Sequence, residues 1–197
     1  MILYRRNLLN YFKSDKNSIF SYQLAELMGI TPAQVRRDLM VIGYSGSPAK
    51  GYDIRSLIKS IGQFIDAETR QSVALVGVGN IGRAIIDYFK GRREKLDITA
   101  LFDIDPNKIN RSLYDCPCFH IDQLEEVIQK QHIRVGIITV PDKSAQEVAE
   151  HLVHAGITGI LNYAPVKLEL SQDIYIENRD MIMAIEKVAY FARNHGN

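Results

Sequence analysis

The pattern Gly77-Val78-Gly79-Asn80-Ile81-Gly82 contains the residues whose types and spacing most clearly imply chemistry. It follows a short apolar run, 73–76, and precedes a segment with helical periodicity that continues to Phe89. In a G-x-G-x-x-G turn the first glycine permits the tight bend, the second leaves room for a diphosphate, and the third lets the helix pack on the strand. The first N–H groups of that helix would bind the phosphates. We predict a dinucleotide site that includes these six residues.

A carboxylate follows at the position expected for a ribose-binding acid. Asp103 ends the next apolar run and lies 21 residues after Gly82, close to the usual spacing of about 20. Because a carboxylate accepts hydrogen bonds from a ribose diol and repels a 2′-phosphate, NAD(H) is favoured over NADP(H) as the cofactor. Two alternatives stay open. The glycines could serve only the turn of a Rossmann-like fold, or the fold could bind another nucleotide such as coenzyme A.

Strand ends later in the chain are expected to meet the same nucleotide. The run 134–140 predicts a buried parallel strand, 144–155 a helix, and 158–163 the next strand. Alternating strands and helices favour an α/β fold with a doubly wound parallel sheet, in which ligands bind at the carboxyl ends of the strands. Ordinary turn chemistry is the alternative for the polar residues at these ends. The further contacts predicted on this ground are Thr139, Val140, Pro141, Asn162, Ala164 and Pro165.

The first third of the chain has the pattern of a helix-turn-helix. Helices are expected at 4–12, 22–28 and 32–42, and the last two are joined by a short turn. We expect Ser21 and Thr31 to cap the second and third helices, with Pro32 at the first position of the third. The apolar residues of the third helix recur at core-facing positions. Its opposite face and flanks therefore present Ala33, Gln34, Arg36 and Arg37.

Glutamine and arginine side chains can bond to base edges and phosphates, so the third helix is predicted to recognise DNA. A solvated charged face on a structural helix is the alternative. The following segment, 43–52, has glycines around Ser-Pro-Ala-Lys and predicts the hairpin wing of a winged helix, with Lys50 able to reach a phosphate or the minor groove. Asp53 is expected to cap a helix that closes this domain.

The distribution of charge supports the same partner for the same region. The whole chain has a net charge of +1, but residues 1–70 carry 10 Lys/Arg against 6 Asp/Glu (+4), and residues 71–197 carry 14 against 17 (−3). A polyanion is therefore expected to meet the N-terminal part. Nothing resembles a signal peptide or a membrane span. Cys116 and Cys118, which have no partners at zinc spacing, fit a reducing cytoplasm, and we expect neither a metal nor a membrane.

The segment 181–192 predicts a terminal helix that is apolar around most of its circumference. Such a helix is unfavourable in water and must be buried in its own domain or against a second subunit, of which we favour the second. The expected domains are thus a winged-helix DNA-binding domain at 1–70, a Rossmann NAD(H)-binding domain at 71–177, and a C-terminal helix at 178–197. That helix is expected to be swapped into the partner subunit of a homodimer.

Taken together and in this order, several stretches resemble the Rex family of bacterial redox-sensing transcriptional repressors. They are residues 33–39, 51–52, 77–82, 102–106, 139–141, 156–165 and 177–180. The resemblance covers nearly the whole chain. It implies a homodimer with N-terminal winged helices, NAD(H)-binding Rossmann domains and exchanged C-terminal helices. It also implies that the protein binds double-stranded operator DNA with an inverted repeat when NADH is low, and is released when NADH binds.

The resemblance also implies roles for single residues. Arg36 and Arg37 match the family's DNA-contacting pair. Tyr88 matches a tyrosine on the helix after the glycines, and Asp180 matches an aspartate from the partner subunit; in the family the two interact when reduced cofactor is bound. Met181 stands where the family commonly has a phenylalanine near the nicotinamide. On this ground Tyr88, Asp180 and Met181 join the predicted cofactor site, and Ser21, Thr31, Gly51 and Tyr52 join Ala33, Gln34, Arg36, Arg37 and Lys50 as predicted DNA contacts.

Two further functions stay open as alternatives. Pro48 replaces an arginine that is usual in the family's wing, so with Met181 it leaves room for a Rex-like DNA-binding protein with a weakened NADH response. An NAD-dependent oxidoreductase with an accessory DNA-binding domain is the other alternative. Little chain remains after Asn162 for a substrate, and no histidine or lysine stands out as a partner for hydride transfer. We therefore expect no catalytic residues and a protein that is not an enzyme.

Overall fold

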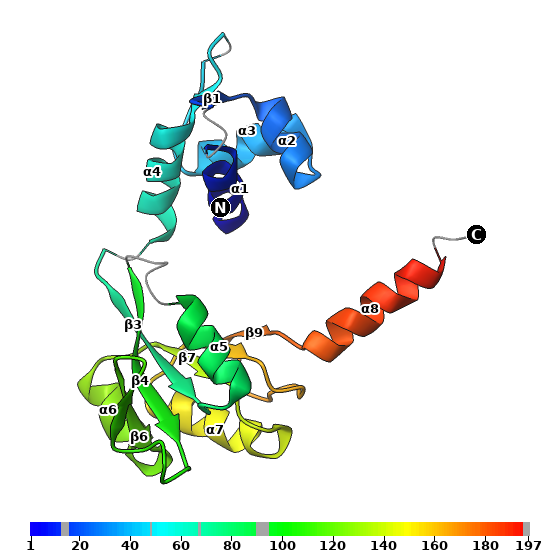
Figure 1. Cartoon of the computed structure of the whole chain (residues 1–197). Coiled ribbons are helices and arrows are strands. Elements are labelled where there is room, and N and C mark those ends of the chain that lie inside the picture. Colours follow the sequence, from blue (N-terminus) through cyan, green and yellow to red (C-terminus); the bar gives the residue numbers. More distant parts are fainter. Residues whose placement is uncertain (13–15, 48, 67, 90–94, 195–197) are drawn as a thin grey trace. The chain divides into compact units, whose positions relative to one another are not determined.

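The computed structural model describes residues 1–12, 16–47, 49–66, 68–89 and 95–194. The chain divides into two compact units, Met1–Glu68 and Thr69–Asn197, whose elements are labelled in Figure 1. Pro48, the altered position in the wing, lies outside the described residues.

The first unit is a small helical domain with a two-stranded sheet. Strand β1 pairs antiparallel with β2, and a bridge joins Ser47 to Gly51 in the segment before β2, as expected for a wing. The core includes the fully buried Leu8, Leu24, Val35 and Leu39. This arrangement confirms the predicted winged helix-turn-helix. Its elements are α1 (Ile2–Phe12), β1 (Ser18–Ile19), α2 (Ser21–Met28), α3 (Pro32–Val41), β2 (Tyr52–Asp53) and α4 (Ile54–Ile65).

Side-chain caps fix where the helices of this unit begin. The Thr31 hydroxyl accepts a 3.2 Å hydrogen bond from the backbone N–H of Gln34, and Asp53 caps α4 in the same way, both as predicted. The prediction that Ser21 caps α2 was wrong. Ser21 is the first helical residue, and the cap position is Phe20, whose N–H donates to Gln23 Oε1 at 2.8 Å. The Gln23 side chain, in the first turn, thus accepts from the N–H of the cap residue itself, a different donor from the N–H groups inside the helix that a capping serine hydroxyl would bind.

The second unit is built on a seven-stranded sheet with the order β5-β6-β4-β3-β7-β8-β9. All neighbouring pairs are parallel except β5 with β6. The chain crosses from β4 and β6 on one side of β3 to β7 and β8 on the other, so the carboxyl end of β3 lies at a topological switch point. The strands are β3 (Gln71–Val76), β4 (Leu96–Asp103), β5 (Arg111–Leu113), β6 (Cys116–His120), β7 (Val135–Ile138), β8 (Gly159–Asn162) and β9 (Tyr175–Asn178).

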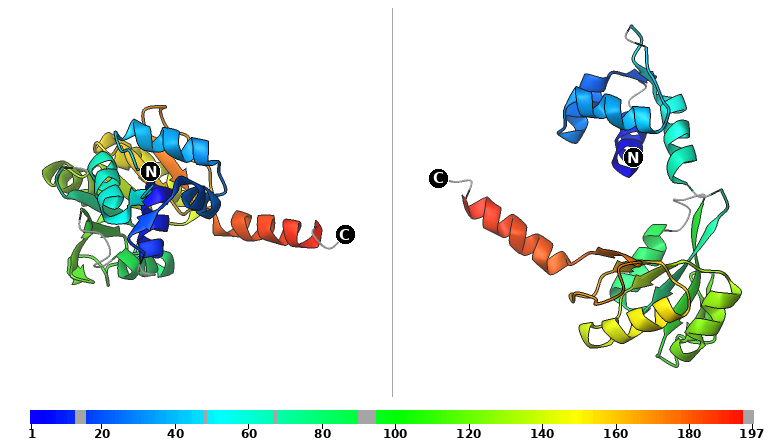
Figure 2. Two further views of the ribbon diagram at one scale, coloured as in Figure 1. Left: turned by 90° about the horizontal axis from the view of Figure 1, so that it is seen from above. Right: turned by 180° about the vertical axis from the view of Figure 1, so that it is seen from behind.

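Helices cover both faces of this sheet, as the predicted Rossmann fold requires. Alternate residues of β3 point to opposite faces: Leu75 packs in one cluster with Ile86 of α5, and Val76 packs in the other with residues of α6 and α7. In the right-hand view of Figure 2, α6 and α7 lie in front of the sheet and α5 behind it. These helices are α5 (Asn80–Phe89), α6 (Leu124–Lys130), preceded by a 3₁₀ turn (Ile121–Gln123), and α7 (Asp142–His154).

The terminal helix α8 (Met181–Asn194) follows β9, and among the described residues its apolar side chains are exposed. All residues from 181 to 193 are exposed, including Ile185 at 66% and Val188 at 69%. This agrees with the expectation that α8 is not buried in its own domain. Its exchange with a second subunit stays a prediction. Over the described part of the chain, helices that combine the length and apolar character needed to cross a bilayer are absent.

Candidate functional sites

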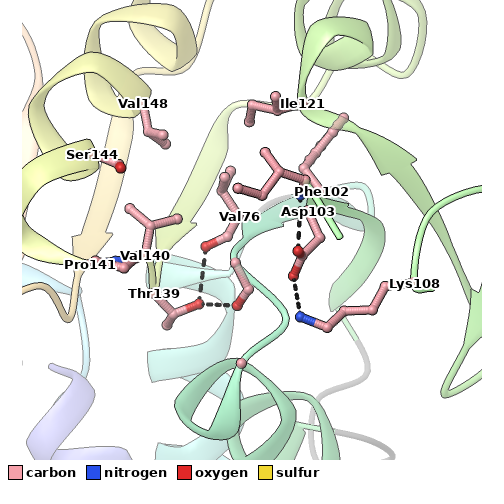
Figure 3. A pocket seen from close by; sticks show the side chains of 13 residues that line it. Val76, Phe102, Asp103, Lys108, Ile121, Thr139, Val140, Pro141, Ser144 and Val148 are labelled. Carbon is pink, nitrogen blue, oxygen red and sulfur yellow. Dashed lines mark hydrogen bonds and ion pairs between the residues drawn. The ribbon is translucent and has the colours of Figure 1, made fainter. Parts of the chain in front are cut away.

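A cavity of about 240 Å³ opens at the carboxyl ends of β3, β4 and β7. Figure 3 shows the Asp103 and Lys108 side chains meeting on one side of the glycine-rich loop and Thr139 on the other. The rest of the wall is mainly apolar and includes Phe102, Ile121 and Val148. Of the residues predicted to contact a cofactor, the cavity brings together Gly77, Gly79, Asp103, Thr139, Val140 and Pro141.

The three glycines meet three different spatial demands. Gly77 has φ +95°, and a Cβ there would lie 2.8 Å from the backbone oxygen of Thr139, so the turn requires glycine. A Cβ on Gly82 would collide with the carbonyl oxygen of Gly77, because α5 lies close against the end of β3. At Gly79 a Cβ would meet no atom of the described residues within 4 Å. The room beside Gly79 is thus unused by the protein, next to the N-terminus of α5, where a diphosphate would bind.

Asp103 is a buried carboxylate held by several donors. Its side chain is 9% exposed and accepts hydrogen bonds from the backbone N–H groups of Val78, Ile104 and Asp105, each at 2.8–2.9 Å. Lys108 Nζ is a fourth donor, at 2.9 Å. Burial alone would raise the pKa of Asp103, but the hydrogen bonds from Asp105, Lys108 and Val78 outweigh it and hold the pKa below its ordinary value. The carboxylate is therefore ionised at neutral pH.

Thr139 fixes the glycine-rich loop from the neighbouring strand. Its hydroxyl lies 2.6 Å from the carbonyl oxygen of Gly77 and 3.0 Å from that of Val76, and it can donate to either. The hydroxyl thus supports the loop that faces the cavity. The position of Thr139 at a strand end predicted a contact with the cofactor but not this support of the loop.

Other predicted cofactor residues lie outside this cavity. Asn162 is fully buried at the end of β8, where its side chain bonds to Val166, Asn178 and Ala164 and so orders the turn after the strand. Ala164 is packed in the core, and Pro165 is exposed beside it. The remaining loop and helix residues predicted for the site, which do not line the cavity either, are Val78, Asn80, Ile81, Gly82, Tyr88, Asp180 and Met181.

Of the three residues implied in signalling, Tyr88 and Met181 are exposed and Asp180 is half-buried. Tyr88 is 66% exposed near the end of α5, and Met181 is 61% exposed at the start of α8. Asp180 precedes α8, and its carboxylate accepts a 2.9 Å hydrogen bond from the N–H of Met183. The exposed Tyr88 and Met181 side chains are thus available for contacts, whereas Asp180 is engaged at the start of α8.

Sequence reasoning missed part of the cavity wall. Lys108, Ile121, Ser144 and Val148 line the cavity without belonging to any motif. Lys108 had a usable signal, because Pro106 and the turn after β4 return the chain toward Asp103 within five residues. The others come from the segment after β6 and from α7, and sequence spacing does not reveal their approach.

The predicted DNA-contacting face of α3 is partly free and partly tied down. Ala33, Arg36 and Arg37 are exposed, and Arg36 Nη1 donates to Ser21 Oγ at 3.2 Å, which joins α3 to the start of α2. Gln34 Nε2 instead donates to Asp38 Oδ1 at 2.6 Å within the helix. To reach a base, Gln34 would have to leave Asp38. The arginines are thus the side chains of α3 best placed for DNA.

The other predicted DNA contacts, in the wing and at the start of α3, are likewise partly exposed and partly buried. Lys50 is exposed in the turn that the Ser47–Gly51 bridge closes, and Thr31 is exposed at the start of α3. Gly51 has φ +71°, and a Cβ there would lie 2.7 Å from the carbonyl oxygen of Ile19. Tyr52 is only 8% exposed and packs in the core of the unit. Gly51 and Tyr52 therefore shape the wing, and Lys50 is an exposed cation among its described residues.

Comparison with known protein families finds two matches within the chain. Residues 68–166 match the family described as CoA binding domain, and residues 1–39 match one described as putative DNA-binding protein N-terminus. The chain is also similar to curated proteins over almost its whole length. It is 37% identical to the redox-sensing transcriptional repressor Rex of Syntrophobacter fumaroxidans, over 95% of this chain and 90% of that protein. It is 34% identical to the Rex protein of Anoxybacillus flavithermus, over 99% and 92%.

Solved structures show the same likeness. A crystal structure of RSP in complex with NAD⁺ and operator DNA matches with a TM-score of 0.87 and 29% identity, covering 98% of this chain and 88% of that one. The structure of RSP, described as a Rex-family repressor, with NADH matches with a TM-score of 0.84 at the same identity, covering 98% and 90%.

Proposed function

This chain belongs to the Rex family of redox-sensing transcriptional repressors, and on that premise we propose that it represses transcription by sensing the NADH/NAD⁺ ratio. It binds operator DNA when NADH is low and leaves it when NADH binds. The observation that carries the proposal is that one cavity joins the open space beside Gly79 to the carboxylate of Asp103. Those are the two features that a dinucleotide needs for its diphosphate and ribose.

The residues present fit NAD(H). The N-terminus of α5 and the space at Gly79 suit the diphosphate, Asp103 suits a ribose diol, and the apolar wall around Ile121 and Val148 suits a base. Two solved relatives hold NAD⁺ or NADH, although the matched domain description names coenzyme A. Asp103 favours NAD(H) over coenzyme A, because a ribose phosphate next to a buried carboxylate is repelled.

The bound cofactor would supply a nicotinamide ring that is cationic when oxidised and neutral when reduced. A ligand shifts a conformational equilibrium only as far as it prefers one state, so the protein must contact the ring differently in its two forms. We place that discrimination at Tyr88, Asp180 and Met181, on the strength of the family resemblance and the accessibility of the Tyr88 and Met181 side chains. Asn162, Ala164 and Pro165 stay secondary members of the proposed site.

The DNA partner is proposed to meet the first unit through Arg36, Arg37 and Lys50, supported by Ser21, Thr31 and Ala33. A two-fold homodimer would bind an inverted repeat with half-sites a whole number of helical turns apart. The exposed apolar residues of α8 support such a dimer, in which a second subunit covers them. We propose that residues 1–70 bind DNA, that residues 71–177 bind NAD(H), and that residues 178–197 form the exchanged helix. We also propose that the protein works in the cytoplasm.

Members of the family are regulators, and we propose that this protein catalyses no reaction. Three of the polar side chains that line the cavity have proposed roles other than catalysis: Asp103 binds the ribose, Lys108 pairs with Asp103, and Thr139 supports the loop. Incubation with NADH and a panel of 2-hydroxy acids and aldehydes tests this assignment. Steady turnover of the nicotinamide would contradict it.

The function is tested by fluorescence anisotropy on a labelled inverted repeat of the kind bound by Rex proteins, with NADH, NAD⁺ and coenzyme A titrated separately. NADH should release the DNA at far lower concentration than NAD⁺, and coenzyme A should have no effect. If reduced and oxidised cofactor released the DNA equally, or if neither did, the sensing function would be wrong. The protein would then be only a DNA-binding protein with a nucleotide fold.

A further inference from the structure

Lys108 binds the carboxylate of Asp103, the group that is proposed to bind the ribose. It follows β4 in a turn and lines the cavity, and its Nζ lies 2.9 Å from Asp103 Oδ2 and 3.6 Å from Asp105 Oδ2. The Lys108 side chain is 30% exposed, so it stands between the buried carboxylate and solvent. Figure 3 shows it approaching Asp103 from the side opposite to Thr139.

The hydrogen bonds of Asp103 use the whole accepting capacity of the carboxylate. Oδ1 accepts from the N–H groups of Ile104 and Asp105, and Oδ2 accepts from the N–H of Val78 and from Lys108. A carboxylate offers about four lone-pair positions, and all of them are taken. A ribose hydroxyl that donates to Asp103 must therefore replace one of these donors.

Of the four donors, Lys108 is the one that can move. The three N–H groups belong to the backbone at the end of β4 and in the glycine-rich loop, where a shift would disturb the fold. Lys108 is an ammonium at the end of a flexible four-carbon chain. On leaving Asp103 it keeps Asp105 as a partner at the edge of the cavity.

We propose that Lys108 is a specificity-determining residue of the nucleotide site, one that competes with the ribose diol for Asp103 and lessens the rejection of a ribose phosphate. The proposal rests on the dinucleotide site of the proposed function. With Lys108 in place the charge of Asp103 is compensated, so a 2′-phosphate meets a weaker negative field than a bare carboxylate would produce. Displaced from Asp103, the same ammonium stays close enough to pair with that phosphate.

Isothermal titration of the full-length protein with NADH and with NADPH tests the proposal. The parent is compared with Lys108→Met, which keeps the length of the side chain without its charge, and with Lys108→Arg, which keeps the charge. Lys130→Met removes a lysine at the exposed end of α6, away from the cavity, and controls for net charge. Lys108→Gln is a second neutral variant in case the methionine variant does not fold.

In the neutral variants the Kd for NADH should fall at least threefold and the Kd for NADPH should rise, so that their ratio widens at least tenfold. The arginine and Lys130 variants should stay within about threefold of the parent. A ratio within twofold of the parent in folded K108M or K108Q would overturn the proposal. If such an unchanged ratio were found while NADH still released the parent protein from the operator, only the role of Lys108 would be wrong. If the parent binds no NADH at all, the proposed function fails and this inference fails with it.

Discussion

The hydroxyl of Thr139, at the end of β7, donates a hydrogen bond of 2.6 Å to the carbonyl oxygen of Gly77, at the end of β3. The two residues are 62 positions apart in the chain. Their approach is so close that a Cβ on Gly77 would lie 2.8 Å from the Thr139 backbone oxygen. The turn that faces the cavity is thus held in place by the neighbouring strand as well as by its own glycines.

Replacing Thr139 with valine should loosen that turn. The variant keeps the β-branched shape but leaves the Gly77 carbonyl without its side-chain donor, which should lower the free energy of unfolding by about 1–3 kcal/mol. NADH affinity should fall several-fold because the loop must be ordered on binding. Urea unfolding and calorimetric titration measure the two effects. Thr139→Ser retains the hydroxyl and should stay close to the parent; equal losses in the serine and valine variants would contradict the role of the hydrogen bond.

The sequence was sufficient where function depends on local backbone geometry. Gly77, Gly79, Gly82 and Asp103 lie within one strand–helix–strand unit, so their spacing alone predicted the loop and the acid beside it. Contacts between distant segments could not be found in this way. Lys108 reaches Asp103 because the turn after β4 folds back, and it fills the last accepting position of that carboxylate. The spacing of the two residues in the sequence is consistent with this contact but does not establish it.

Polar residues at strand ends and helix starts were the least predictable. Asn162 ends β8 at the expected edge of the sheet, yet its amide is consumed by the turn that follows. Ser21 is a favourable capping residue by type, but the helix already begins at Ser21, and the Ser21 hydroxyl accepts a hydrogen bond from Arg36 instead. Residue type sets what a side chain can bond to, and tertiary neighbours decide which bond forms.

On the DNA side, Arg37→Ala should weaken operator binding by roughly 1–3 kcal/mol if the side chain reads a base. Arg37 is exposed on α3, so its removal leaves the core of the first unit intact. Lys59→Ala removes an exposed positive charge from α4 and is the matched control for net charge. Anisotropy on the operator and on scrambled DNA separates the two kinds of contact. If Arg37 contacts a base, Arg37→Ala lowers affinity for the operator alone. Equal losses of affinity for the operator and for scrambled DNA would show that Arg37 contacts a phosphate.

Signal transmission should depend on Tyr88 and Asp180. Tyr88→Phe and Asp180→Ala should leave operator affinity within about twofold of the parent and raise the NADH concentration needed for release severalfold, since the contact is expected only with reduced cofactor. Tyr175→Phe alters another exposed tyrosine of the second unit and should have no effect. Unchanged NADH titration curves for both variants, measured on labelled operator, would rule out this coupling.

The two cysteines should be poor redox sensors. Burial raises the pKa of Cys116 to about 12 and that of Cys118 to about 11, so both are thiols at neutral pH. Ellman's reagent at pH 8 should label them slowly in the native protein and rapidly in urea. Rapid native labelling would contradict this assignment.

The same shifts in the pKa values of the two thiols make the free energy of unfolding fall with rising pH. The thiols ionise above a pKa of about 9 in the unfolded chain, but only near 11 (Cys118) and 12 (Cys116) in the folded chain. Their contribution to stability is therefore complete below pH 9 and is lost as the pH rises through these values.

Gly79 separates a requirement of the ligand from a requirement of the fold. A methyl group at Gly79 would meet no atom within 4 Å in the described part of the chain, and the residue does not have a positive φ, so Gly79→Ala should fold as stably as the parent. It should nonetheless lose NADH binding by at least tenfold, because the methyl group fills the space a diphosphate needs. Gly159→Ala, in β8, has the same freedom from contacts and should change neither property. Thermal unfolding and NADH titration of both variants suffice. If G79A bound NADH as well as G159A does, the diphosphate would have to lie elsewhere, and the empty space beside α5 would have no part in cofactor binding.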